Sequence, residues 1–152
     1  MEAKKVWIYA STRDFTAQEL SFIENNSTAF LSSWESHGSK VAGDITIHDN
    51  RFIVVFAGDC GDAMCGRAQD SQVNLIKTLE ATLQVGLLDR MQVQFLQNDL
   101  INSLSLIDFK NEISKGKVTA DTIVYNNTIT SGEQFPKEWK VQLSDSWHSQ
   151  LL

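Results

Sequence analysis

The chain has 152 residues, enough for one domain with its own core, and its 42% hydrophobic and 21% charged residues are typical of globular proteins and not of disordered or fibrous ones. A formal net charge of −6 disfavours nucleic acids and anionic membranes as partners, because phosphate binding depends on a basic surface. No membrane-spanning run or signal peptide is recognisable, and two cysteines fit a reducing compartment, so we expect a cytoplasmic protein with no membrane partner.

Strand and helix patterns alternate through the first 98 residues. A capping box, in which Thr16 and Glu19 can each bond the other's backbone N–H, marks the start of the first helix. Asp49 and Asn50 form a turn between two strands, and Asp70 is a candidate cap for the second helix. In chain order the patterns predict a strand at 6–9, a helix at 16–37, strands at 43–48 and 51–57, a helix at 70–86 and a strand at 91–95.

This order of elements is βαββαβ, the ferredoxin-like arrangement of the α+β class, with a four-stranded antiparallel sheet and both helices on one face. We therefore expect a ferredoxin-like unit at residues 1–98. Residues 99–152 hold a helix pattern at 105–116, a strand pattern at 121–125 and an aromatic end. They are too apolar to be disordered, so we expect a C-terminal αβ extension packed on the same core, giving one structural domain.

A sheet covered by helices on one face leaves the other face open. If Val6 and Ile8 face the helices, period-2 alternation places Trp7 and Tyr9 on the open face. A soluble protein rarely exposes such an apolar patch. Three covers are possible: the C-terminal extension through Trp139, Val141 and Trp147, a second copy of the chain, or a ligand. The aromatic face is also a feature of RNA-binding modules, but the acidic charge argues against RNA.

The same topology brings charged loop residues to one end of the predicted sheet. Three of the four arginines gather there with a histidine, at the end to which the N-terminus of the first helix also points. They form a candidate site for a small anionic ligand. The alternative is that neighbouring aspartates neutralise them as surface pairs. The candidate residues are Arg13, His48, Arg51 and Arg90, and the neighbouring aspartates are Asp14, Asp49 and Asp89.

The loop before the second helix is a candidate thiol site, with Cys60, Cys65 and Arg67. A cysteine near a helix N-terminus and an arginine has a lowered pKa, as nucleophilic cysteines need. The spacing matches neither a Cys-x-x-Cys redox motif nor a usual zinc site, so we expect no metal. His48 is expected at the other end of the sheet from the cysteines. The rise per residue of a strand places it about 20 Å from them. Only His148 could approach; otherwise the cysteines are inert.

The glycine-rich loop also lacks the features of a phosphate-binding loop. Arg67 and Ala68 stand where that loop needs lysine followed by serine or threonine. ATP hydrolysis is therefore not supported, and we expect no cofactor.

Across nearly its full length the chain resembles a family of small proteins, mainly from the Bacteroidetes, that has no established function and is sometimes labelled "ABC transporter ATPase". The resemblance implies no catalytic or binding residues. A Cys-Ser-Ile-Asp run precedes the second helix in the family, whereas this chain has Arg67-Ala-Gln-Asp70. The segments that carry the resemblance are 6–9, 50–52, 70–73, 88–90, 121–127 and 145–148.

The sequence thus leaves three hypotheses about function. The first is a non-enzymatic cytoplasmic binding or interaction protein that self-associates through the open sheet face. The second is an enzyme or binder that acts on a small anionic ligand at the arginine corner, and the third is a thiol enzyme.

Overall fold

The computed structural model describes residues 2–58 and 66–152 of an α+β protein whose strands pair only in antiparallel fashion. The strands are β1 (Ala3–Ala10), β2 (Glu35–Ser36), β3 (Ser39–Lys40), β4 (Gly43–His48), β5 (Phe52–Gly58), β6 (Gln92–Gln97), β7 (Leu100–Ser105), β8 (Ile123–Tyr125) and β9 (Lys140–Gln142). The helices are α1 (Ala17–Ser33), α2 (Gly66–Leu83), α3 (Leu106–Ser114), α4 (Phe135–Glu138) and the 3₁₀ helices η1 (Leu143–Asp145) and η2 (Trp147–Leu151).

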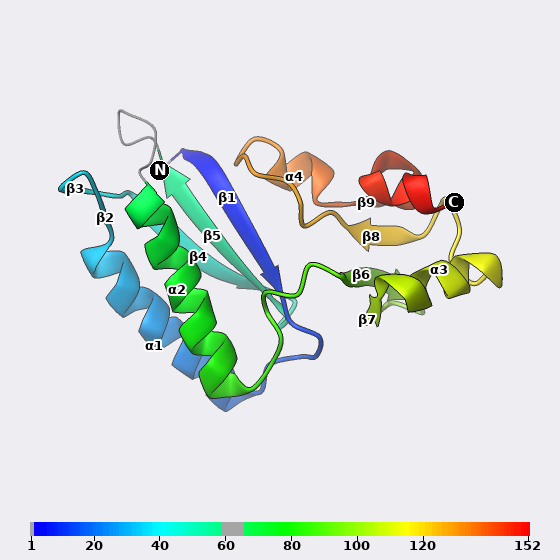
Figure 1. Ribbon diagram of the computed structural model, residues 1–152, viewed down its shortest axis with the longest axis horizontal. Helices are drawn as coiled ribbons and strands as arrows, with labels where there is room; N and C mark the ends of the chain where they lie inside the picture. Colours follow the sequence, from blue (N-terminus) through cyan, green and yellow to red (C-terminus); the bar gives the residue numbers. More distant parts are fainter. Residues whose placement is uncertain (1, 59–65) are drawn as a thin grey trace.

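The first sheet has the order β1-β5-β4, and α1 and α2 lie side by side on one of its faces (Figure 1). The β4–β5 hairpin forms as predicted, because Asp49 and Asn50 both adopt the positive φ, 54°, of a two-residue turn. The capping box of Thr16 and Glu19 is confirmed at the start of α1. The second helix begins at Gly66, so Asp70 lies inside α2 and is not its cap.

Trp7 and Tyr9 face the helices, which corrects the expectation that they lie on the open face. Strand register decides this: Trp7 pairs with Val55, which also pairs with Ile45, so the three side chains share one face. Trp7 makes an edge contact with Trp34, the two ring centroids 6.1 Å apart. The Tyr9 hydroxyl donates to the Gln72 Oε1 of α2 over 2.7 Å.

The predicted fourth strand does not join the first sheet, so the four-stranded ferredoxin-like sheet is not formed by these hydrogen bonds. β6 instead belongs to a second sheet of order β7-β6-β8-β9. Asn98 and Asp99, both at positive φ, turn β6 directly into β7, and β8 takes the other edge of β6. β6 therefore pairs with β7 and β8 and not with β1. The boundary expected at residue 98 therefore lies within a hairpin.

The C-terminal extension covers the face of the first sheet opposite the helices, as one of the three alternatives expected. Trp139 packs on the Phe52 ring, with centroids 5.0 Å apart, and on the Tyr125 ring at 5.2 Å. Val141 and Trp147 lie elsewhere: Val141 packs in the core of the second sheet and Trp147 stacks on His148. The residues buried between the sheets, which we call the inter-sheet cluster, are Val6, Ile8, Phe52, Val54, Tyr125, Ile129 and Trp139.

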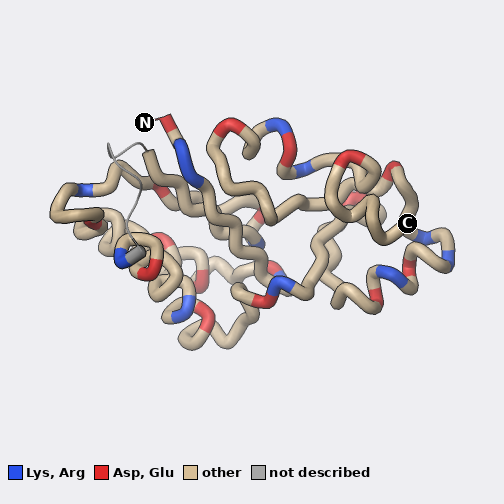
Figure 2. Tube along the Cα trace, turned by 45° about the horizontal axis from the view of Figure 1, so that its top comes forward, with Lys and Arg blue, Asp and Glu red and all other residues tan. Residues whose placement is uncertain are grey.

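Charged residues of both signs are interspersed along the chain, as Figure 2 shows for the described segments. None of the helices in those segments has the length and apolar character that crossing a bilayer requires.

Candidate functional site

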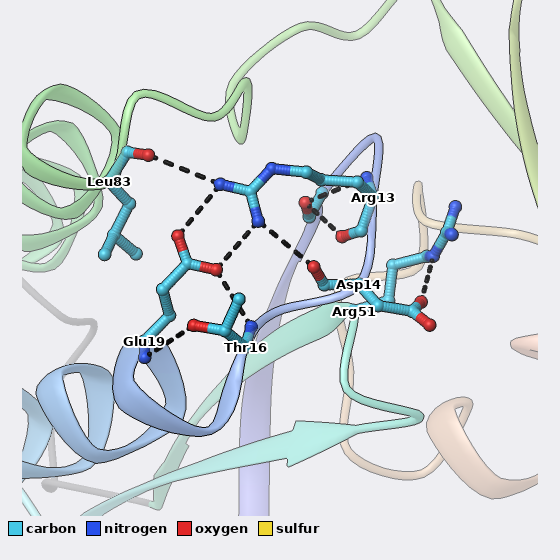
Figure 3. A network of polar contacts seen from close by, with 7 residues as sticks. Arg13, Asp14, Thr16, Glu19, Arg51 and Leu83 are labelled. Carbon is cyan, nitrogen blue, oxygen red and sulfur yellow. Dashed lines mark hydrogen bonds and ion pairs between the residues drawn. The ribbon is translucent and has the colours of Figure 1, made fainter.

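Arg13 binds a carboxylate of the protein itself. Its Nη1 and Nη2 donate to the two carboxylate oxygens of Glu19 over 2.7 and 2.8 Å (Figure 3). Nη2 also reaches the carbonyl oxygen of Leu83, the last residue of α2, at 3.4 Å. The hydrogen bonds from Arg13, followed by the one from the Thr16 backbone N–H, lower the pKa of Glu19 to about 2. Arg13 therefore joins the start of α1 to the end of α2.

Arg51 is also paired within the protein, as Figure 3 shows beside the Arg13 network. Its Nε donates to the Asp14 Oδ1 over 3.0 Å, and its side chain is only 12% exposed. With Arg13 and Arg51 both bound to carboxylates, the anion-binding corner expected from the sequence does not form as one site. The alternative of pairing with neighbouring aspartates describes Arg51, whereas the carboxylate partner of Arg13 is Glu19.

His48 is turned towards the C-terminal extension. Its Nε2 is 2.8 Å from the Thr46 Oγ1, and its ring meets the edges of the Phe135 and Trp139 rings. Burial lowers the pKa of His48, while the charge of Asp49 acts in the opposite direction. The side chain belongs to the packing between the sheets and not to an anion site.

Arg90, the third predicted arginine, lines a cleft that Arg13 and Arg51 do not reach. The cleft has a volume of about 80 Å³ and lies between the free edge of β1 and the second sheet. β6, the strand predicted to lie beside β1, pairs with β7 and β8 instead. Its lining comes from Ile8, Ala10, Leu87, Asp89, Arg90, Gln92, Val93, Gln94, Tyr125, Asn127, Thr128, Trp147 and His148.

The Arg90 guanidinium is held against an aromatic ring and not by a carboxylate. It lies 5.8 Å from the centroid of the Tyr9 ring, a cation–π distance. The Arg90 side chain forms no hydrogen bond or ion pair with any of the described residues, 2–58 and 66–152. The neighbouring Asp89 also lines the cleft, but its Oδ1 accepts the Met91 N–H at 2.8 Å. Arg90 thus offers a charge that the described chain does not neutralise by contact.

Main-chain groups of β1 also face the cleft. Val6 N–H bonds outward to the Thr130 carbonyl, while Ser11 N–H bonds to Arg51 of the first sheet. Since main-chain groups alternate between the two sides of an antiparallel strand, those of Ile8 and Ala10 point the same way as those of Val6. The vacated strand position therefore presents backbone donors and acceptors to the cleft.

Side-chain amides form the opposite wall. Asn127 Nδ2 donates to Gln94 Oε1 over 2.8 Å, and Asn127 Oδ1 accepts the Trp139 indole N–H at 2.9 Å. Gln94 Nε2 donates to the Ser103 hydroxyl, which in turn bonds the Gln92 Oε1 at 3.3 Å. This network fixes the wall and leaves the Gln92 amide nitrogen as a neutral donor at the cleft.

His148 closes the cleft with a neutral ring. It is 1% exposed, its Nδ1 lies 2.6 Å from the Ser146 Oγ, and the Trp147 ring stacks on it at 3.9 Å. Burial lowers its pKa to about 4, so the imidazole is uncharged at neutral pH. The cleft therefore combines the Arg90 cation and the Asp89 carboxylate with neutral hydrogen-bonding groups.

The other predicted site cannot be placed. Cys60 and Cys65 lie outside the described residues, while Arg67 is exposed in the first turn of α2. In the described segments, no group of three or more metal-ligating side chains comes together.

The chain matches no protein-family model, no curated protein and no solved structure.

Proposed function

We propose that the protein binds a small molecule bearing a carboxylate or a phosphate group, in the cleft beside Arg90. The observation that supports this is that Arg90 lines the cleft and that its guanidinium has no acidic partner among the described residues. Its planar fork suits either anion, because both present two oxygens at matching spacing. The Gln92 amide and the outward N–H groups of β1 would orient the remainder of the ligand.

The size of the cleft favours a small ligand. About 80 Å³ is room for several water molecules, so a bound anion would displace or share ordered water. The proposal keeps the non-enzymatic interpretation of the sequence and moves the anion site from the arginine corner to Arg90 alone. Self-association through the open sheet face is not part of it, since the extension covers that face.

We also propose that β1, β5 and β4 with α1 and α2 are a ferredoxin-like unit whose fourth strand position is vacant. This relation is supported by the order of the elements and by the two helices on one face. It gives the cleft a defined place in the fold, at the strand edge where β6 would otherwise pair.

The test is to titrate the full chain with acetate, succinate and inorganic phosphate at low salt and to monitor binding by NMR and calorimetry. Saturable shifts at Arg90, Gln92 and the 8–10 segment are expected, and the better probe identifies the anion class. Arg90→Gln should weaken binding about tenfold or more, because it removes a charge-assisted bond. Lys110→Gln removes one positive charge from an exposed position of α3 and should change nothing. Equal binding by Arg90→Gln, or no binding of any probe at 10 mM, would contradict the proposal.

A further inference from the structure

A second free strand edge lies on the other side of the first sheet, at β4. Gly58 N–H bonds to the Ala42 carbonyl, and Arg51 N–H bonds to the His48 carbonyl. The main-chain groups of the even-numbered residues Ala42 and His48 therefore point towards β5. By alternation, the main-chain groups of the intervening Gly43, Ile45 and Ile47 point away from the sheet. The edge is thus six residues long and carries outward donors and acceptors.

Only one of these outward groups has a partner in the described chain. Ile45 N–H bonds to the Oδ1 of its neighbour Asp44 over 2.9 Å. That contact is local and exposed, and a strand edge of this kind is a template for an added strand. The side chains of Ile45 and Ile47 meanwhile pack with the helices, so an added strand would lie beside α1.

The space between α1 and β4 is hollow along this edge. Two hollows, of about 530 and 430 Å³, adjoin each other and share Thr28 and Leu31 of α1. Ile45 and Ile47 line one of them, and Val41 lines the other. Together they form what we call the α1–β4 groove, which has an apolar wall and a strand edge.

One residue that lines the groove carries a buried polar atom without a hydrogen-bond partner. Ser27 is 5% exposed and lines the 430 Å³ hollow, and its Oγ has no hydrogen bond to any described residue. A serine inside a helix commonly bonds the carbonyl one turn back, and a buried hydroxyl left unbonded costs free energy. The hydroxyl is closed to solvent, so it does not select an occupant of the groove.

The charges at the groove indicate which occupant fits. Glu24 and Asp44 border the 430 Å³ hollow and form no ion pair with a described residue, whereas Lys40 borders the other hollow. A second copy would bring its own Asp44 and Glu24 to the same edge, where like charges repel. A partner segment with a basic residue beside Glu24 and Asp44, and none beside Lys40, has no such conflict.

We propose that the α1–β4 groove binds an extended peptide segment of a partner protein, which adds a strand to β4. Alternate apolar side chains of the peptide would enter the groove against Leu31, Ile45 and Ile47, and a lysine or arginine would lie beside Glu24 and Asp44. Main-chain bonds supply affinity and the pockets supply specificity, as in other cases of strand addition. This surface is separate from the Arg90 cleft.

The experiment titrates the full chain with the probe peptide acetyl-Lys-Val-Thr-Val-Lys-Val-amide and monitors binding by NMR and calorimetry. Binding should shift the amide signals of residues 24–31 and 43–47. A peptide with glutamate in place of lysine, and one N-methylated at alternate residues, should each bind at least about tenfold more weakly. Arg90→Gln should leave peptide binding unchanged, which separates this test from that of the cleft.

The test variant is the double substitution Glu24→Gln with Asp44→Asn. The matched control is the double substitution Glu133→Gln with Asp121→Asn, at exposed positions outside the groove. Both pairs remove two negative charges, but only the first should weaken binding of the lysine peptide, by about fivefold or more. The proposal is overturned if the N-methylated peptide binds as well as the probe, if no peptide binds at 1 mM, or if both variant pairs behave alike. It is also overturned if sedimentation shows that the wild-type chain itself forms a dimer through β4.

Discussion

His148 should make the protein lose stability in mild acid. The ring is 1% exposed, and burial lowers its pKa from 6.5 to about 4. The unfolded chain therefore takes up the proton more readily than the folded one, so stability is complete above pH 6.5 and falls as the pH drops from 6.5 to 4. From the two pKa values, the free energy of unfolding should fall by about 2 to 3 kcal/mol between pH 7 and pH 4.5.

Urea unfolding at a series of pH values measures this loss. His148→Asn places an amide near the Nδ1 position beside Ser146, but this side chain cannot titrate. The variant should therefore lack the loss of about 2 to 3 kcal/mol that His148 causes in the wild type between pH 7 and pH 4.5. His37→Asn removes an exposed imidazole at a φ of 53° that asparagine tolerates, and it serves as the control. Parallel pH profiles of wild type and His148→Asn would refute the reasoning.

Three further substitutions test the packing. Trp139→Ala should lower the free energy of unfolding by about 3 to 5 kcal/mol in urea titration, because the ring is 7% exposed within the inter-sheet cluster; a loss below 1 kcal/mol would mean that the extension is only loosely attached. Gly132→Ala should destabilise by about 1 to 3 kcal/mol, since its Cβ would meet the carbonyl oxygen of Ala3. Gly86→Ala, whose Cβ has open space, is the control and should stay within about 0.5 kcal/mol of wild type. Thr16→Ala should cost about 1 kcal/mol by thermal unfolding through loss of the cap, and an unchanged melting temperature would argue against the cap.

Local chemistry made much of the fold predictable. The capping box at Thr16 and the turn at Asp49-Asn50 act through neighbouring residues, and both form as the sequence indicates. The faces of β1 were not predictable in the same way. Val6 and Ile8 are as buried as Tyr9, so alternation alone cannot tell which set meets the helices, and only the pairing register with β5 decides.

The strand β7 was missed for a related reason. The unit predicted at residues 1–98 ends at Asn98, although Asn98 and Asp99 form a hairpin turn when a strand follows. Recognising that hairpin would have given β6 a local partner in place of β1. The cleft could not be predicted, since Arg90, Asn127 and His148 come together only through this change of sheet.

The order in which the two sheets are made has a consequence for synthesis on the ribosome. All elements of the first sheet and its two helices are complete at Leu83, whereas Trp139, which covers the opposite face, emerges ~56 residues and roughly 3 to 11 s later at ordinary elongation rates. During that interval the nascent protein can close its helical side but must carry Val6, Ile8, Phe52 and Val54 bare. The half-made chain is thus the form most exposed to aggregation and most dependent on chaperones.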